Sequence, residues 1–436
     1  MVQDGSKPLK VVTRFGTVAL KRRIVCLQPS QGEASGSGGR HSFPSNALLP
    51  AHEGMVITRG LQQWACLLPQ ELPFAVATRL LGWQAQEEAL LSASTLRNLV
   101  REHGQILEAA AQQEASALLA QWAEAQREFP APNLTPLTNP PRRRPGWPVQ
   151  LNEAVDAALK ESSLIPPQGV RQNDWERVLA ARREEADVSV TKLRFLGPRV
   201  GPDEVLLSVD EVLTRKPIKR CFHELRTARI VTATGTRYVS GRGSAFLVIL
   251  TALLYLCAGQ PRSLLVIADG AGWIRDWYEQ LRGTLSASTL LLDWYHLVKK
   301  CREKCCMICR GKKAKTLLLK PLLRALWQGE VEQALLVLEA HRSQAKNLEV
   351  LDQLQGYLRE RRRFIPNYGQ RRQERAYIGS AHVEKANDLL VAQRQKGQGM
   401  HWSEDTSVSL AVLRTLLLNG GWEQYWTEHT VMSLAA

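Results

Sequence analysis

Residues 264–296 read LLVIADGAGWIRDWYEQLRGTLSASTLLLDWYH, and this stretch decides the fold. An apolar run ends on Asp269-Gly270, a tryptophan-rich helical segment follows, and a second apolar run ends on Asp293. Continuous runs of Val, Ile and Leu are typical of buried parallel strands, and open α/β sheets carry functional groups at the carboxyl ends of such strands. The stretch therefore predicts two strands that bring two acids to one edge of a sheet.

The segments on either side extend this pattern. In chain order the predicted elements are a strand at 204–210, a hairpin of 228–234 and 236–240 about Gly235, a helix at 244–258, a strand at 264–268, a helix at 272–282 and a strand at 289–292. The resulting order is β, β, β, α, β, α, β. It is the order of an RNase H-like domain, an α/β fold with a mixed sheet whose first strand lies centrally beside the fourth.

From His296 to about Phe364 the sequence predicts helices and no strand. Residues 299–324 hold ten Lys or Arg and one Glu, which indicates an all-helical insertion with a basic face. Such a face is either a solvated surface or a binding surface, and charge of one sign favours a polyanionic ligand. After the insertion we expect a helix over residues 381–396 with Ser380 as its N-cap, and a last helix over residues 404–418.

The chain is strongly basic, with 57 Lys or Arg against 42 Asp or Glu and a net charge of +15. This excess favours a polyanionic partner, nucleic acid first and an anionic membrane second; the alternative is a merely soluble basic protein. The N-terminus MVQDGSKPLK lacks the apolar core of a signal peptide, and the most hydrophobic segment, 245–258, is too short to cross a bilayer. The eight cysteines are therefore expected to be reduced thiols in a cytoplasmic protein.

The N-terminal part alternates apolar with polar or basic residues over 9–22, which predicts a small β-hairpin. Residues 75–81 and 94–103 have helical spacing around a turn, and two interpretations are open: a DNA-binding helix-turn-helix, or an ordinary helical hairpin. Residues 108–128 are also helical. The proline-rich stretch 129–148 cannot be helical and predicts an interdomain linker, one that can lie along phosphates through its arginines.

These predictions divide the chain into six parts. They are a mainly helical N-terminal DNA-binding region (1–128), the linker (129–148), a helical connector (149–203), the first part of an RNase H-like core (204–296), the helical insertion (297–376) and the last part of the core with C-terminal helices (377–436). A chain of 436 residues is too long for one compact core, so two or three domains are expected.

Three carboxylates lie at positions that suit metal-dependent phosphoryl transfer. Asp210 ends the first core strand, Asp269 ends the fourth, and Glu384 lies on the helix after the insertion. Two-metal transfer needs hard oxygen ligands around two magnesium ions about 3.5 to 4 Å apart. Acids at the ends of neighbouring strands, about 4.8 Å apart, can share such ions. Asp293 ends a strand one position further out, so it is expected to support the site rather than to bind the ions.

Four stretches of the sequence resemble one known family. They are VIADGAGWI (266–274), LLDWYHLVKK (291–300), YIGSAHVEKAND (377–388) and GMHWSEDTSVSLAVLRTLLLNGGWEQYW (399–426). In this order they resemble the DDE transposases of bacterial insertion sequences, in the branch related to Mutator-like elements. The resemblance covers about residues 205–426. Before residue 151, VVTRFGTVALKR and LSASTLRNLVREHG resemble more loosely the family's N-terminal DNA-binding portion.

The resemblance implies a DNA transposase that cuts at transposon ends and joins the freed 3′-hydroxyl to target DNA. It implies that Asp210, Asp269 and Glu384 are the catalytic acids and hold two Mg²⁺ ions, for which Mn²⁺ can substitute. Asp293 and His296 match the family's Cys/Asp-x-x-His signature before an all-helical insertion. The implied partners are the transposon terminal repeats, target DNA and further copies of the chain in a homo-oligomer on DNA. The implied location is the bacterial cytoplasm, at the nucleoid.

Basic residues of the linker and the insertion are the predicted contacts to the DNA backbone. They are Arg142, Arg143, Arg144, Lys299, Lys300, Lys312, Lys313, Arg361, Arg362 and Arg363. Two alternative functions are compatible with part of this prediction. One is an RNase H-like nuclease that only hydrolyses DNA, and the other is a non-catalytic DNA-binding protein derived from a transposase.

His296 and a cysteine series have two interpretations each. His296 can contact a phosphate or help arrange the acids, or it can hydrogen-bond Asp293 and fix the start of the insertion, which we favour. Cys301, Cys305 and Cys309 suggest metal ligands, but their i, i+4, i+8 spacing strings them along one straight helix, which cannot wrap a tetrahedral ion. A packed thiol face is therefore the favoured interpretation.

The tryptophans also have two interpretations. Trp273, Trp277 and Trp294 are either core residues or platforms that stack on unpaired bases at a transposon end. Three others, Trp402, Trp422 and Trp426, are expected to pack the C-terminal region.

Overall fold

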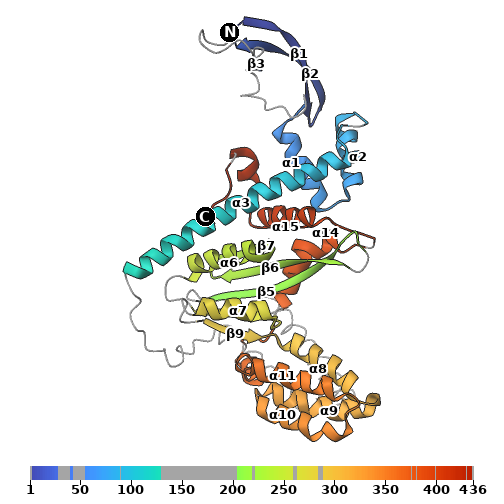
Figure 1. Cartoon of the computed structure of the whole chain (residues 1–436), viewed down its shortest axis with the longest axis vertical. Coiled ribbons are helices and arrows are strands. Elements are labelled where there is room, and N and C mark those ends of the chain that lie inside the picture. Colours follow the sequence, from blue (N-terminus) through green and yellow to red (C-terminus); the bar gives the residue numbers. More distant parts are fainter. Residues whose placement is uncertain are drawn as a thin grey trace, which may run out of the picture.

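The structure is a computed structural model in which residues 2–27, 40–42, 55–88, 90–128, 204–218, 221–258, 263–282, 288–374, 376–379, 381–397, 399–428 and 430–434 are described. It is a mixed α/β protein with two sheets and several helices (Figure 1). Several predictions lie outside the described residues. They are the linker 129–148, the connector 149–203, the arginines Arg142, Arg143 and Arg144, and the cap Ser380.

The larger sheet has five strands. They are β5 (Glu204–Arg215), β6 (Phe222–Thr232), β7 (Gly235–Gly241), β8 (Ser263–Ala268) and β9 (Ser288–Leu292). The strand order is β7-β6-β5-β8-β9; β5 is antiparallel to β6 and parallel to β8, and β8 is parallel to β9. The first strand of this sheet is therefore central and beside the fourth, as the element order predicts.

Strand β5 is longer than predicted, and the prediction that Asp210 ends it is wrong. Pairing of β5 with β8 stops at Ser208 and Ile267, but pairing with β6 continues to Arg215 and Phe222. Beyond Asp210 buried and exposed residues alternate, because only one face of this two-stranded extension is covered. The apolar run EVLLSVD marks only the part of β5 that is buried on both faces.

Helices cover both faces of the larger sheet. Val205, Leu207 and Val209 of β5 share a core cluster with α6 (Gly243–Ala258) and α7 (Gly272–Arg282). Val212 shares a separate cluster with α13 (Ala381–Asn387) and α15 (Glu404–Leu418), which are joined by a π-helical turn (Asp388–Ala392) and α14 (Gln393–Gln395). Successive side chains of a strand point to opposite faces, so these clusters are two different layers.

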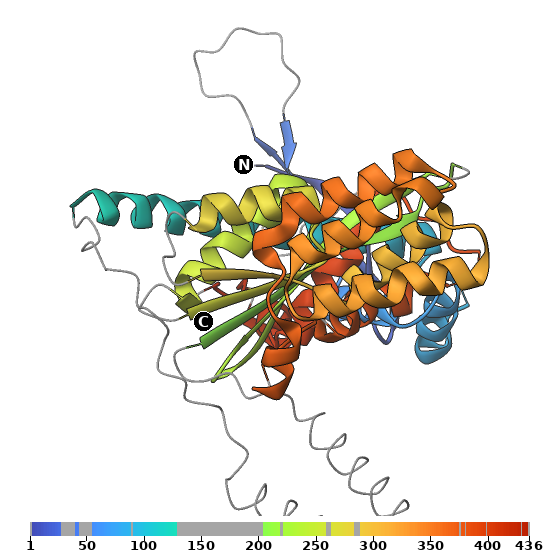
Figure 2. The same ribbon diagram turned by 90° about the horizontal axis from the view of Figure 1, so that it is seen from below.

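Among its described residues the insertion between β9 and α13 contains helices and no strand, as predicted (Figure 2). Its helices are α8 (Trp294–Ile308), α9 (Gly311–Trp327), α10 (Val331–Ala340), α11 (Leu348–Arg361) and α12 (Tyr368–Gln373). Cys301, Cys305 and Cys309 are buried, and burial raises the pKa of the first two thiols to about 12. The predicted packed thiol face is confirmed.

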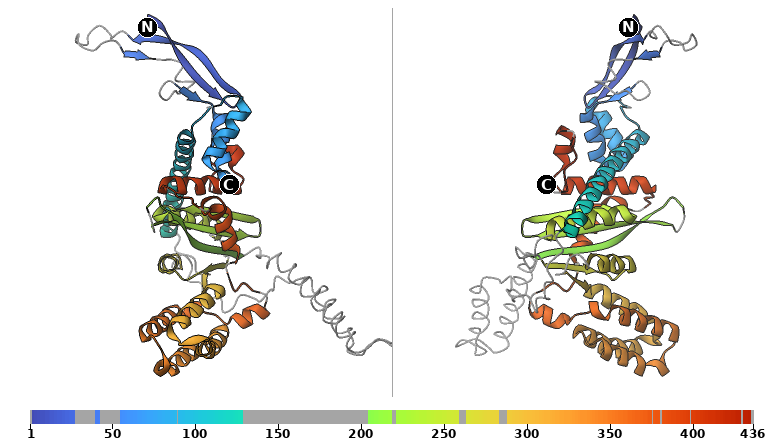
Figure 3. Two further views of the ribbon diagram at one scale, coloured as in Figure 1. Left: turned by 90° about the vertical axis from the view of Figure 1, so that its right-hand side faces the viewer. Right: turned by 60° about the vertical axis from the view of Figure 1, so that its left-hand side comes forward.

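The N-terminal part contains the second sheet, in the order β3-β2-β1-β4, and three helices (Figure 3). Its elements are β1 (Val2–Thr13), β2 (Gly16–Leu27), β3 (Arg40–Ser42), β4 (Met55–Ile57), α1 (Arg59–Leu67), α2 (Phe74–Ala85) and α3 (Ala93–Glu128). The predicted hairpin is confirmed and is longer than residues 9–22. The helices α2 and α3 fit either interpretation of the predicted helix pair. No helix in the part of the chain that the structure describes is long and apolar enough to cross a bilayer.

Helix α3 packs on α15 and is continuous where two separate helical segments were predicted. Leu96, Val100 and Leu107 of α3 share a core cluster with Leu410 and Leu413 of α15. The same cluster holds the C-terminal tryptophans Trp402, Trp422 and Trp426, so their predicted packing is confirmed. The helix crossing ties the N-terminal part to the layer that covers the larger sheet.

Gly104 of α3 allows the close approach of the two helices. A Cβ built on this residue would lie 2.3 Å from the Ser409 Cβ and 2.6 Å from the Ser409 Cα. We predict that Gly104→Ala lowers the free energy of unfolding by about 1 to 3 kcal/mol, because the helices must separate. Gly356→Ala in α11, where nothing lies within 4 Å, should instead raise it by about 0.5 to 1 kcal/mol. Urea denaturation of both variants measures whether the free energy of unfolding falls or rises in each. A rise in Gly104→Ala would contradict the close approach of α3 and α15.

Candidate functional site

Three aspartates lie in one row across three adjacent parallel strands. Ser208 of β5 pairs with Ile267 of β8, and two residues further in each strand come Asp210 and Asp269. Ala268 of β8 pairs with Leu292 of β9, and the next residues are Asp269 and Asp293. The ladder continues into this row, because the Asp293 amide donates to the Ala268 carbonyl at 2.8 Å. The register of the sheet therefore sets the three residues at one level, on or directly after three adjacent strands.

Asp210 is held by groups from its own strand and from α13. Its Oδ1 accepts a hydrogen bond from the Glu211 amide at 2.8 Å, and its Oδ2 accepts one from Asn387 Nδ2 at 2.7 Å. The Asn387 carbonyl oxygen in turn accepts from the Thr227 hydroxyl of β6. Burial raises the pKa of Asp210, and the charge of Asp269 raises it further, although the two hydrogen bonds and His296 oppose these effects.

Asp269 is fixed by the turn that follows β8. Its Oδ1 accepts from the Ala271 amide at 2.8 Å. Gly270 has φ +81°, and a Cβ there would lie 2.6 Å from Leu292 Cδ1, so only glycine fits without strain. The Gly270 carbonyl accepts from Arg361 Nε at 3.1 Å and from Arg361 Nη2 at 2.9 Å. A side chain of the insertion thus holds the loop that carries Asp269.

Asp293 and His296 join the row to the insertion. The Asp293 side chain is buried and caps α8, with Oδ1 accepting from the amides of Tyr295 at 2.6 Å and His296 at 3.1 Å. His296 Nδ1 lies 3.5 Å from Asp293 Oδ2, which is long for a hydrogen bond but within ion-pair distance. Asp293 raises the pKa of His296 most, and the charges of Asp210 and Asp269 add to the effect. His296 therefore lies beside Asp293 at the start of the insertion, an arrangement that agrees with the structural interpretation of this residue.

Glu384 is the one predicted acid that the structure leaves apart from this row. It is exposed on α13, three residues before Asn387, and residues three apart lie on the same face of a helix. Because Asn387 donates to Asp210, Glu384 lies on the helix face turned toward the row, one turn away. Within the described residues no group of three or more His, Cys, Asp or Glu side chains is close enough to hold a metal ion. The predicted set of three acids is therefore only partly assembled.

Sequence reasoning missed two residues of this site. No role is predicted for Asn387 from the sequence, although the i, i+3 spacing of Glu384 and Asn387 sets both on one helix face and could have indicated it. Arg361 was predicted to bind DNA, but its side chain is 13% exposed, holds the Gly270 carbonyl and lies over the Tyr357 ring at 4.2 Å. No local sequence pattern indicates that contact, because 91 residues separate Arg361 from Gly270.

The three tryptophans near the aspartate row are buried to different degrees. Trp277 is buried and donates to Thr251 at 3.0 Å, so it is a core residue. Trp294 is partly buried and packs on Trp327 with ring centroids 4.8 Å apart. Trp273 is only partly buried. Its Nε1 donates to Glu211 Oε2 at 3.1 Å, next to Asp210.

Most of the predicted DNA contacts in the insertion are exposed. Lys299, Lys300, Lys312 and Lys313 are exposed, and the Arg362 side chain is 71% exposed. Arg363 donates to Glu279 of α7 at 2.6 Å, which leaves it only partly available for a phosphate.

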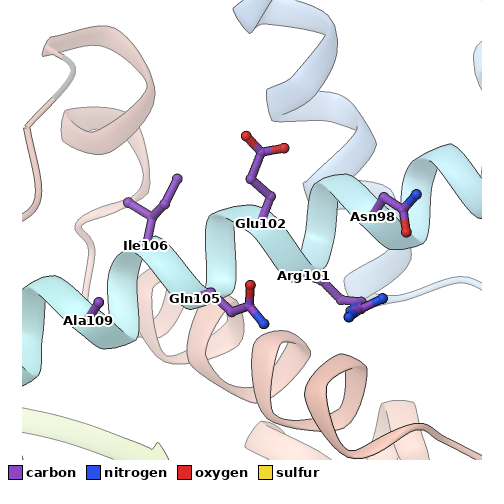
Figure 4. A pocket seen from close by; sticks show the side chains of 6 residues that line it. All are labelled: Asn98, Arg101, Glu102, Gln105, Ile106 and Ala109. Atoms are coloured by element: carbon purple, nitrogen blue, oxygen red, sulfur yellow. The ribbon is translucent and has the colours of Figure 1, made fainter. Parts of the chain in front are cut away.

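A groove elsewhere on the surface is lined by residues of α3 alone (Figure 4). They are Asn98, Arg101, Glu102, Gln105, Ile106 and Ala109. This groove includes none of the predicted site residues, so it is separate from the aspartate row.

Comparison with known proteins adds no relative. No protein-family model matches the sequence, and no curated protein matches it. The function must therefore be inferred from the residues and the geometry of this chain.

Arg361 gives a test of how the Asp269 loop is held. Replacing it with alanine removes two charge-assisted hydrogen bonds to the Gly270 carbonyl, so Arg361→Ala should lower the free energy of unfolding by about 1.5 to 3 kcal/mol. The neighbouring Arg362→Ala, at an exposed position, should change it by less than about 0.5 kcal/mol. Urea denaturation compares the two, and equal effects would contradict the contact.

His296 predicts a pH dependence of stability. Its pKa in the folded protein is raised above 6.5, chiefly by Asp293, so its contribution is complete below pH 6.5 and is lost as pH rises through the folded-state pKa. The stability advantage of the wild type over His296→Gln should therefore shrink with rising pH. Unfolding free energies of both proteins on either side of the transition measure this, and an advantage that is constant or grows with pH would contradict the ion pair.

Proposed function

We propose that this chain is a DNA transposase whose larger sheet and flanking helices form an RNase H-like catalytic core. The observation that carries the proposal is the row of Asp210 and Asp269 on adjacent parallel strands, with α13 bonded to the first of them. Strand order supports it, since the first strand of the larger sheet lies beside the fourth. The all-helical insertion directly after Asp293 and His296 agrees with the family that the sequence resembles.

The donor set suits Mg²⁺. Carboxylate oxygens are the ligands that this ion prefers, and Asp210, Asp269 and Glu384 would hold it. Burial and the neighbouring Asp269 both raise the pKa of Asp210, and a cation between them would relieve the repulsion that contributes to this rise. When bound, two such ions would supply activation of the attacking oxygen and stabilisation of the leaving oxygen of a phosphodiester.

The chain's own residues orient the acids. Asn387 fixes the direction of Asp210 Oδ2, and the Ala271 amide fixes Asp269 Oδ1. His296, held by Asp293, places a titratable positive charge beside the two acids, where it offsets their charge and can attract a phosphate. Trp273 and Arg226 stack beside Glu211, the residue after Asp210, with the guanidinium carbon 4.1 Å from the ring centroid.

The electrostatics of the chain suit a DNA substrate. The net charge of +15 favours a polyanion, and the exposed lysines of α8 and α9 lie on the insertion that begins at the aspartate row. The proposed partners are therefore transposon ends and target DNA, bound by more than one copy of the chain.

Asp269→Asn tests the catalytic assignment. Asparagine keeps the oxygen that accepts from the Ala271 amide but removes the charge, so the variant should fold normally. We expect Mg²⁺-dependent nicking of supercoiled plasmid DNA by the wild type, and a loss of at least about a thousandfold in the variant, or about 4 kcal/mol in barrier height. Asp276→Asn on α7, whose side chain is 67% exposed, is the matched control and should stay active.

The products separate transposition from simple hydrolysis. A plasmid carrying the DNA that flanks this gene should yield products in which a freed 3′-hydroxyl is joined to new DNA, as sequencing across the junctions detects. Hydrolysis without joined products would favour a nuclease, and the absence of any metal-dependent cleavage would favour a non-catalytic DNA-binding protein. Full activity in Asp269→Asn would overturn the site.

A further inference from the structure

One face of the N-terminal β1–β2 ribbon is open along its whole middle part. Three cross-strand pairs define this open face: Ser6 with Arg23, Pro8 with Lys21, and Lys10 with Ala19. Residues directly opposite each other point to the same side of a sheet, and all six are exposed. The other face differs, because Leu9 and Val11 are buried there against Val56 of β4.

All charged residues of the open face are cations. Each of its three pairs contributes one cation: Lys10 comes from β1, Lys21 and Arg23 come from β2, and none of them lies opposite another. Residues 2–27 contain six Lys or Arg and a single acid, Asp4. Among the described residues no carboxylate forms an ion pair with any of these three cations. Charges of one sign repel one another unless a ligand neutralises them.

The middle of the ribbon is narrow enough to enter a groove of DNA. β4 pairs with β1 only at 10–12, and β3 pairs with β2 only at 25–27. Between these points, over 6–9 and 20–23, the ribbon is two strands wide among the described residues. Lys21 and Arg23 lie in this part, and Lys10 lies at its border, where β4 begins to pair. A two-stranded β-ribbon fits the major groove of B-form DNA, which is about 12 Å wide. Same-face residues on one strand lie about 6.8 Å apart, so the cations can reach several phosphates.

The ribbon is fixed at one end and projects at the other. Near its turn, Glu87 accepts from the Thr17 amide at 2.9 Å and from the Thr17 hydroxyl at 2.7 Å, and the Thr58 amide donates to the Val12 carbonyl at 2.9 Å. The opposite end points away from α1 and α2 (Figure 3). A ribbon held in this way can present its open face without ordering a free segment on binding.

We propose that the open face of the β1–β2 ribbon docks on duplex DNA in the major groove, with Lys10, Lys21 and Arg23 on phosphates. The choice of DNA rests on the proposed function, and charge complementarity selects this face for it. DNA binding then includes sequence-independent contacts from the ribbon and does not depend on α2 and α3 alone.

The test is binding of a fluorescein-labelled 30-base-pair duplex, followed by fluorescence anisotropy in EDTA with full-length protein carrying Asp269→Asn. Because no cleavage occurs under these conditions, a failure of the catalytic proposal leaves the result intact. The triple variant Lys10→Gln/Lys21→Gln/Arg23→Gln should bind at least tenfold more weakly at 100 mM salt. The slope of log K against log salt should fall by about 2 to 3, near one for each lost phosphate contact.

A control with equal charge loss is Arg215→Gln/Arg282→Gln/Lys396→Gln, three exposed cations on β5, on α7 and at the end of α14. It should change the slope by less than about 1. Equal losses in the two triple variants, or wild-type binding by the ribbon variant, would overturn the proposal. All six substitutions are at exposed positions, and circular dichroism verifies folding.

Two further competition experiments test which groove of the DNA the ribbon occupies and whether DNA is the preferred ligand. Methyl green, which occupies the major groove, should displace the wild type, and netropsin in the minor groove should not. Displacement by netropsin alone would overturn the groove assignment. Vesicles containing phosphatidylserine should not compete with the duplex at equal charge, and stronger binding to vesicles would overturn DNA as the ligand.

Discussion

The candidate site depends on the register of three parallel strands. Pairing of β5 with β8 and of β8 with β9 sets Asp210, Asp269 and Asp293 at one level, so that three acids from distant parts of the sequence become neighbours. A shift of one residue in either pairing would move an acid to the opposite face. The buried apolar runs of β5, β8 and β9 fix this register, which means that the sheet core, not a loop, sets the spacing of the carboxylates.

The insertion is part of the site rather than an appendage to it. Asp293 ends the sheet and begins α8, and Arg361 returns from α11 to hold the loop between Asp269 and α7. Each acid in the row is therefore supported by a different part of the chain. Asp210 depends on α13 through Asn387, so movement of α13 would carry Glu384 and the Asp210 contact together.

The sequence predicted what local patterns encode. Runs of buried residues gave β8, α7 and β9 nearly to the residue, and a basic, strand-free segment gave the insertion. The end of β5 was misplaced because an alternating edge extension has no apolar run. The roles of Asn387 and Arg361 come from contacts across 177 and 91 residues. The helical segments predicted at 94–103 and 108–128 join into α3, in which Gly104 packs against Ser409, a residue that is also distant in sequence. Such contacts depend on tertiary packing, which spacing alone does not determine.

The central claim is that Asp210 and Asp269 share a divalent cation. A crystal structure of the protein soaked with Mn²⁺, with anomalous scattering recorded, tests it most directly. We expect an anomalous peak between the two carboxylates, with Glu384 moved in from its exposed position on α13. A structure that binds Mn²⁺ elsewhere, or that leaves Asp210 bonded only to Asn387 and Glu211 with no peak beside it at saturating Mn²⁺, would contradict the claim.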